Sequence, residues 1–178
     1  RQKELVEAGS VLGVKIFRQL DLVESHYPDM KDLVSQIVEV IRDLKPDCVI
    51  TVDPTLLYEA HPTHRSVGQA VLDASLFAHN KHFPILDGAL NVHALSCVGF
   101  YASSHPNTFI DISSTFDLKC LAIQKHVSQF NEVDFNQLIT YLKYRSFENG
   151  KDRGMGLAES FKLLPLVLTH MMVESESY

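Results

Sequence analysis

Residues 30–54 read MKDLVSQIVEVIRDLKPDCVITVDP, and this stretch decides the fold. Apolar residues recur at helical spacing over residues 30–44, which predicts a helix of about four turns with one buried face. Residues 48–52 are almost wholly apolar, as in a strand that is covered on both faces. A helix followed directly by such a strand indicates an α/β fold with a parallel sheet.

The segments before residue 30 extend this unit. Residues 14–17 are a short β-prone run, so strand, helix and strand predict a βαβ unit with a right-handed crossover. Residues 1–12 carry apolar side chains on one helical face, and this helix should stop at Gly13, a residue suited to a left-handed C-terminal position. Residues 20–29 are polar and irregular. Because the chain starts in helical rhythm without a methionine, we expect it to have been cut from a longer protein.

The part of the chain after residue 54 alternates between helical and strand patterns. It predicts a helix from Pro62 to about Asn80, strands at 92–101 and 109–112, helices at 115–130 and 135–147, a glycine-rich loop at 150–156, and an edge strand with a docking segment at 157–172. The tail, residues 173–178, should be frayed. No internal repeat or low-complexity linker interrupts the chain, so residues 1–178 are predicted to be a single domain.

The composition excludes several classes of protein. A net charge of -6 without a basic run argues against nucleic acid as a partner. Cys48, Cys97 and Cys120 lie far apart in the sequence without C-x-x-C spacing, which fits the reducing cytoplasm better than a disulfide scaffold. No stretch approaches the roughly 18 continuous apolar residues of a membrane span. We therefore expect a cytoplasmic protein without a membrane span.

The loop after residues 48–52 carries the best candidates for chemistry. In open α/β sheets the ligand crevice lies beyond the carboxyl ends of the strands. His61 and His64, three residues apart at a helix start, can turn both imidazoles towards one small volume. Zinc accepts such donors, but a catalytic zinc needs three protein ligands. Two histidines alone are more often solvated or helix-capping residues than a functional pair, and Asp53 either orients a histidine or opens a turn.

The other histidines are interpreted as structural. His79 and His82 repeat the same spacing near a helix end, where imidazolium interacts favourably with the helix dipole. His126 is expected to be an ordinary surface or capping residue. The isolated histidines receive no functional role: His26, His93, His105 and His170.

Four blocks of sequence, in this order, resemble the PIG-L/LmbE-like deacetylases, enzymes that remove acetyl from N-acetylglucosamine conjugates. The blocks are Arg1-x-x-Glu4 with Leu12-Gly-Val14 and Lys45-Pro-Asp-Cys-Val-Ile-Thr-Val-Asp-Pro54; His61-Pro-Thr-His64-Arg65 with Val67-Gly-Gln-Ala-Val71; Phe109-Ile-Asp-Ile-Ser113 with Phe116-Asp-Leu-Lys119 and His126-Val-Ser-Gln129; and Ala158-Glu-Ser-Phe161. Together they cover most of the chain.

The resemblance implies a Rossmann-like three-layer fold with a mostly parallel sheet, its first strand missing from this chain, and a zinc cofactor. It implies that His64 ligates the metal, that His61 stabilises the oxyanion or donates a proton, and that Arg1 helps to bind substrate. The other two ligands and the general base belong to an A-H-P-D-D-E motif, which does not occur in these residues. We therefore expect this chain by itself to be inactive.

One departure from the family pattern leaves a second interpretation open. Thr63 stands where the family usually has an aspartate, whose charge would orient a neighbouring histidine. A catalytically silent homologue that binds sugars or serves as an assembly subunit is the alternative. A nucleotide-binding Rossmann domain is disfavoured because no G-x-G-x-x-G follows a predicted strand. The expected partners are an N-acetylated amino-sugar conjugate and, in a homo-oligomer, further copies of the chain.

Overall fold

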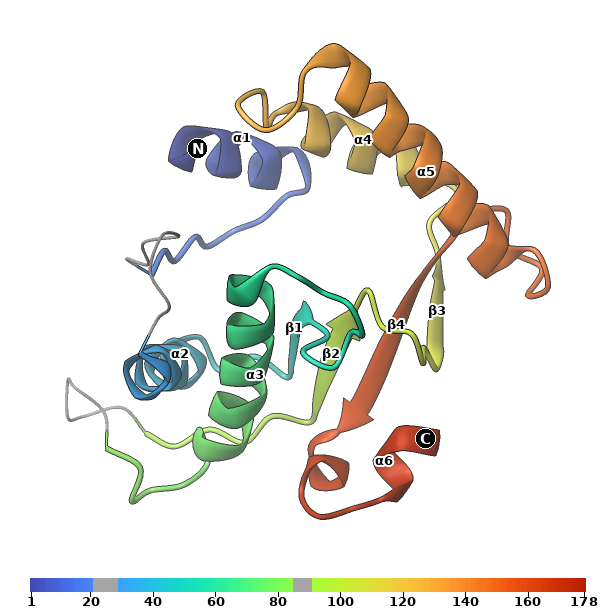
Figure 1. Ribbon diagram of the computed structural model, residues 1–178. Helices are drawn as coiled ribbons and strands as arrows, with labels where there is room; N and C mark the ends of the chain where they lie inside the picture. Colours follow the sequence, from blue (N-terminus) through green and yellow to red (C-terminus); the bar gives the residue numbers. More distant parts are fainter. Residues whose placement is uncertain (21–28, 85–90) are drawn as a thin grey trace. The chain divides into compact units, whose positions relative to one another are not determined.

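The computed structural model describes residues 1–20, 29–84 and 91–178 (Figure 1). The chain divides into two compact units. Unit 1 comprises Arg1–Gln19 with Phe109–Glu159, and unit 2 comprises Leu20–Thr108 with Ser160–Tyr178. The single domain expected from the sequence stays a prediction. No helix within the described ranges is long and apolar enough to cross a bilayer.

Helices and strands are interspersed along the chain. The order is α1 (Gln2–Val11), α2 (Met30–Leu44), β1 (Cys48–Val52), α3 (Pro62–Phe77), β2 (Cys97–Tyr101), β3 (Thr108–Asp111), α4 (Phe116–Gln124), α5 (Glu132–Gly150), β4 (Ala158–Pro165), η1 (Leu166–Thr169) and α6 (Glu174–Ser177). The sheet order is β1-β2-β4-β3. β1 is parallel to β2, and β2 is antiparallel to β4. The α/β class is therefore confirmed.

The core of unit 2 forms where α2 packs against α3. α2 begins at Asp29, whose side chain accepts a hydrogen bond from the Asp32 backbone N–H at 3.0 Å, and it ends at Lys45 in the left-handed conformation. Its apolar face is buried against α3 and the segment before β2, and the buried residues are Leu33, Val34, Ile37, Val38, Ile41, Ala70, Val71, Ala74, Ala78 and Leu95. Burial of each large apolar side chain contributes roughly 1.5–3 kcal/mol, so this interface fixes α3.

Gly68 allows α3 to lie close to the end of β1. A Cβ atom at this position would stand 2.6 Å from the Val52 carbonyl oxygen and 3.2 Å from the Pro54 ring. Such a separation is well inside van der Waals contact, so only glycine fits without a shift of the helix. The close approach positions the first turn of α3 beyond the carboxyl end of β1.

The strand predicted at residues 14–17 is wrong. This segment has no regular secondary structure, and the Val14 and Ile16 side chains are about half exposed. A strand needs a neighbour to bond its backbone groups, and no strand of the described residues pairs with this segment. Gly13 does terminate the preceding helix, with a φ of 76°. The irregular segment predicted at 20–29, with His26, falls largely outside the described residues.

Several predicted boundaries and one strand position also need correction. β4 is not an edge strand, because it lies between β2 and β3. The tail is not frayed throughout, since α6 is a short helix and the buried Lys162 ammonium donates hydrogen bonds to the Glu176 and Tyr178 carbonyl oxygens at 3.0 and 3.2 Å. The helices predicted at 115–130 and 62–80 end earlier, at Gln124 and Phe77, whereas α5 extends to Gly150.

The sheet also brings together two cysteines that are far apart in the sequence. Cys48 and Cys97 are direct partners in the parallel ladder of β1 and β2. Burial, together with a hydrogen bond to Cys97, raises the pKa of the Cys48 thiol to about 12. Cys48 is therefore a protonated, weakly reactive thiol at neutral pH.

Candidate functional site

The first turn of α3 brings the two predicted site histidines together. His61 precedes the helix in an extended conformation, and Pro62 occupies its first turn. The imidazole rings of His61 and His64 are stacked, with centroids 4.4 Å apart and planes 22° from parallel. Both residues are exposed. The spacing therefore places two imidazoles in one small volume, as the sequence predicts.

Glu59 connects both histidines and was missed by the sequence analysis. Its Oε1 accepts a hydrogen bond from the His61 backbone N–H at 2.7 Å, and its Oε2 lies 3.3 Å from His64 Nδ1. Tyr58, with a φ of 67°, turns the chain immediately before it. The signal in the sequence was a carboxylate two residues before the H-x-x-H pair, but only the turn brings it back to His64.

The Glu59 contact defines the chemistry of the His64 ring. The hydrogen bond from the His61 backbone N–H and the contact with His64 lower the pKa of the Glu59 carboxyl, so it is ionised at neutral pH. An ionised carboxylate only accepts hydrogen bonds, so His64 Nδ1 carries the proton. In the neutral ring the lone pair is then on Nε2, where a metal ion can be ligated.

The residues of this loop fit one metal-ligand position rather than a complete site. In many metal sites a carboxylate accepts a hydrogen bond from a histidine that ligates the metal, and the carboxylate fixes the histidine ring and its tautomer. Within residues 1–20, 29–84 and 91–178, no group of three or more His, Cys, Asp or Glu side chains is arranged to hold a metal ion. His64 can therefore contribute one ligand to a set that the described residues do not complete.

Asp53 closes the turn after β1. Its carboxylate is buried and accepts hydrogen bonds from the Thr55 backbone N–H at 2.8 Å and from the Thr55 hydroxyl at 2.7 Å. Its own N–H continues the ladder to the Tyr101 carbonyl oxygen at 3.1 Å. Of the two interpretations of Asp53, the turn-forming one accounts for these bonds. Thr63 is half-buried in the first turn of α3.

Arg1, the predicted substrate-binding residue, belongs to unit 1 and not to the unit that carries the histidines. Its guanidinium meets the Gln129 side chain. Since both guanidinium atoms are donors, the Gln129 amide is assigned with its oxygen towards them, and this oxygen then accepts hydrogen bonds from Arg1 Nε at 2.7 Å and from Nη2 at 3.0 Å. Arg1 and Gln129 come from two of the sequence blocks quoted above, and the sequence did not indicate that they touch.

Among the described histidines outside this pair, His93 makes a structural contact. His93 Nε2 lies 2.7 Å from the Pro46 carbonyl oxygen, a contact that ties the segment before β2 to the start of β1. His79 and His82 are exposed just after α3. His126 is half-buried after α4 and lines a cavity in unit 1.

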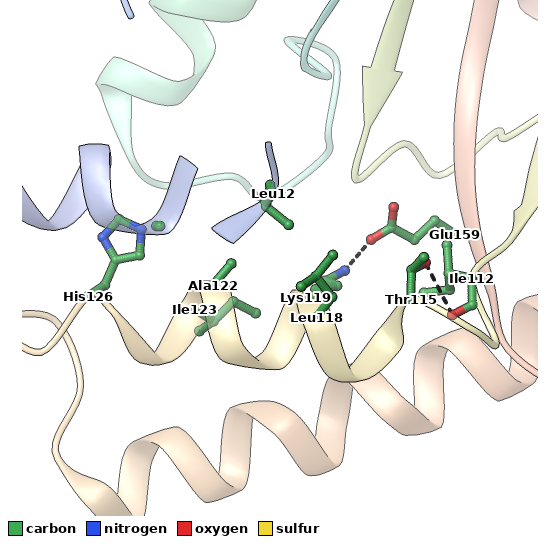
Figure 2. Close-up of a pocket in the computed structure, with 10 residues that line it drawn as sticks. Leu12, Ile112, Thr115, Leu118, Lys119, Ala122, Ile123, His126 and Glu159 are labelled. Atoms are coloured by element: carbon green, nitrogen blue, oxygen red, sulfur yellow. Dashed lines mark hydrogen bonds and ion pairs between the residues drawn. The ribbon is translucent and has the colours of Figure 1, made fainter. Parts of the chain in front are cut away.

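That cavity, of about 410 Å³, lies between α1 and α4 (Figure 2). Its wall is mostly apolar and includes Leu12, Leu118 and Ala122. Its charged groups, the Lys119 ammonium and the Glu159 carboxylate, form an ion pair with each other. Because this pair is already satisfied, it offers a ligand little to bind, and the histidine loop remains the stronger candidate site.

Comparison with known proteins gives a consistent picture. Residues 1–75 match the family described as PIG-L: GlcNAc-PI de-N-acetylase. The chain is 34% identical over 173 residues to the diacetylchitobiose deacetylase of Thermococcus kodakarensis, covering 96% of this chain and 65% of that protein. It is 27% identical over 158 residues to a probable N-acetyl-alpha-D-glucosaminyl L-malate deacetylase 2 of Bacillus anthracis, covering 84% and 62%. The chain thus spans less than two thirds of the length of these curated relatives.

A solved structure confirms the predicted fold. The N,N'-diacetylchitobiose deacetylase of Pyrococcus horikoshii, solved with its inhibitor MPG, matches with a TM-score of 0.92 and 28% identity over 99% of this chain and 67% of that chain. The fold is therefore the Rossmann-like α/β fold expected from the sequence. The family match over residues 1–75, the similar relatives and this fold agree, so the resemblance of the chain to the PIG-L/LmbE family is confirmed.

Proposed function

We propose that this chain forms the larger part of a zinc-dependent hydrolase that removes acetyl from an N-acetylglucosamine-type conjugate. The observation that carries the proposal is the stacked His61 and His64 pair beyond β1, with the Glu59 carboxylate on His64 Nδ1. The names of the similar proteins support the acetylated amino sugar as the substrate class. A cytoplasmic location and a homo-oligomeric state stay predictions.

Each residue of the pair has a distinct role in this proposal. When bound, zinc polarises the acetyl carbonyl and lowers the pKa of water towards roughly 7. His64 supplies one ligand through Nε2, and Glu59 holds the ring in the matching tautomer. His61, stacked on His64, stabilises the negative charge that develops on the acetyl oxygen or donates a proton to the leaving amine. Arg1 contributes to binding of the sugar.

Thr63 favours a second candidate function, a silent homologue that binds sugars or acts as an assembly subunit. Its hydroxyl lacks the charge of the aspartate that the family usually carries beside these histidines. The two functions differ in one measurement on the full-length protein: release of acetate from N,N'-diacetylchitobiose. Release that depends on added zinc and stops with a chelator supports the deacetylase, and sugar binding without release supports the silent homologue.

His61→Ala tests the proposed transition-state role. We expect kcat for acetate release to fall by roughly a hundredfold, because one stabilising group of the transition state is lost. Zinc content should stay at the wild-type level, since His64 still ligates the metal. Steady-state kinetics and metal analysis of the same sample check this, and an unaltered kcat would exclude His61 from the mechanism.

Glu59→Gln tests the orienting carboxylate. The amide keeps the size of the side chain but loses the charge that holds the His64 tautomer, so we expect zinc affinity to fall about 10-fold to 100-fold. Competition with a fluorescent chelator measures this. Gln69→Leu, a change on the exposed face of α3, is the control and should leave the affinity unchanged. Equal affinity of Glu59→Gln and wild type would show that Glu59 does not orient His64.

The lowered pKa of Glu59 also predicts a pH dependence. A carboxyl whose pKa is depressed in the folded protein stabilises its contacts above the unfolded value of 4.5, and the contribution is lost as the pH falls through the folded pKa. Wild type should therefore lose more stability than Glu59→Gln as the pH falls below 4.5. Urea denaturation across this pH range measures the difference, and parallel pH profiles of the free energy of unfolding would contradict it.

A further inference from the structure

We infer that Gln129 positions the Arg1 guanidinium for binding of the acetylated sugar, an inference that rests on the proposed function. Arg1 and Gln129 stand 128 residues apart in the sequence, in the first and third of the blocks quoted above. Unit 1 brings the two together through the packing of α1 against α4. The contact links a predicted substrate-binding residue to a residue without an assigned role.

The contact with Gln129 fixes the orientation of the Arg1 guanidinium plane as well as its position. With its amide oxygen assigned towards the guanidinium, Gln129 accepts from Arg1 Nε at 2.7 Å and from Nη2 at 3.0 Å, so one oxygen bonds two donors along one edge of the guanidinium. A guanidinium is rigid and planar, with five N–H donors in a fixed fork. Holding one edge therefore sets the direction of the other N–H groups, which suit the oxygens of a sugar.

A second contact next to the first holds the segment that carries Gln129. Glu4 lies one turn after Arg1. Its Oε1 accepts a hydrogen bond from the Ser128 backbone N–H at 3.0 Å, and its Oε2 accepts one from the Ser128 hydroxyl at 2.7 Å. The hydrogen bond from the Ser128 hydroxyl is the main reason why the pKa of the Glu4 carboxyl is lowered, so Glu4 is ionised at neutral pH. Glu4 and Ser128 thus fix the backbone from which Gln129 reaches Arg1.

The exposure of these side chains separates a positioning role from a structural one. Arg1, Ser128 and Gln129 are all exposed. Hydrogen bonds at an exposed position contribute little to stability, because water replaces them when they break. Loss of the Gln129 amide should therefore leave the fold intact, and its effect should be confined to how Arg1 is presented.

The experiment is a double-mutant cycle on the full-length protein with N,N'-diacetylchitobiose as substrate. We expect Gln129→Leu and Arg1→Ala each to raise KM about 5-fold to 10-fold, with kcat within about twofold of wild type. The double variant should be no worse than Arg1→Ala alone, because Gln129 acts through Arg1. Gln129→Glu, which retains an acceptor, should restore KM. Gln137→Leu, the same change at an exposed position of α5, is the control.

Three results would overturn the inference. They are an additive increase of KM in the double variant, an unchanged KM in Gln129→Leu, and a lowered melting temperature of Gln129→Leu that accounts for its loss of activity.

If wild type releases no acetate, the proposed function fails, and phenylglyoxal labelling with peptide mass spectrometry then tests the contact. Faster labelling of Arg1 in Gln129→Leu than in wild type, with Arg145 as the internal reference, supports the positioning contact, and equal labelling overturns it.

Discussion

His64→Ala is expected to remove stoichiometric zinc from the full-length protein and to lower kcat/KM for acetate release by on the order of a thousandfold or more. In the proposed site, His64 presents Nε2 to the metal because the Glu59 carboxylate lies 3.3 Å from Nδ1. Alanine leaves no donor at this position, and a catalytic zinc site has few protein ligands to lose. Metal analysis of the purified variant, followed by kinetics of the same sample, measures both effects.

His82→Ala is the matched control for this experiment. His82 is an exposed histidine just after the same helix, α3, and its imidazole is not part of the stacked pair. Its removal should leave zinc content and kcat/KM unchanged. If His64→Ala retained zinc at the wild-type ratio, the assignment of His64 as a ligand would be wrong, whatever the activity of the variant.

Arg42→Met should lower the free energy of unfolding by about 2–3 kcal/mol. Arg42 lies in the last turn of α2, is 2% exposed and caps the C-terminal end of α3. Its Nε donates to the Ala78 carbonyl oxygen at 3.0 Å, and Nη2 donates to the carbonyl oxygens of Asn80 at 2.7 Å and Phe77 at 3.4 Å. The positive charge is also favourable at the negative end of the helix dipole.

The size of this loss of stability depends on the hydrogen bonds that the three carbonyl oxygens keep after the substitution. Each of the three carbonyl oxygens also accepts a backbone hydrogen bond, from His93, Asn80 or Phe83, so none is left without a donor. The loss is therefore that of charge-assisted bonds, and methionine preserves much of the apolar contact. Urea denaturation measures the difference. Lys31→Met, a cation on the exposed face of the same helix, should change stability by less than about 0.5 kcal/mol. Equal effects of the two variants would contradict the capping role of Arg42.

The sequence was sufficient to predict those elements whose structure depends only on neighbouring residues. The helix at 30–44 and the strand at 48–52 form with the predicted bounds, because their apolar period and their capping residues act within a few residues. The start of α3 at Pro62 and the pairing of His61 with His64 follow from the same kind of local rule.

Features that depend on long-range pairing were decided only by the tertiary structure. Residues 14–17 have a strand-like composition but form no strand, since a ladder requires a partner that the local pattern cannot supply. Three features depend on segments that lie 35 or more residues apart in the sequence. They are the position of β4 between β2 and β3, the Arg42 cap on α3, and the contact between Arg1 and Gln129. Periodicity and spacing report which face of an element is buried, but they do not report against which distant element it packs.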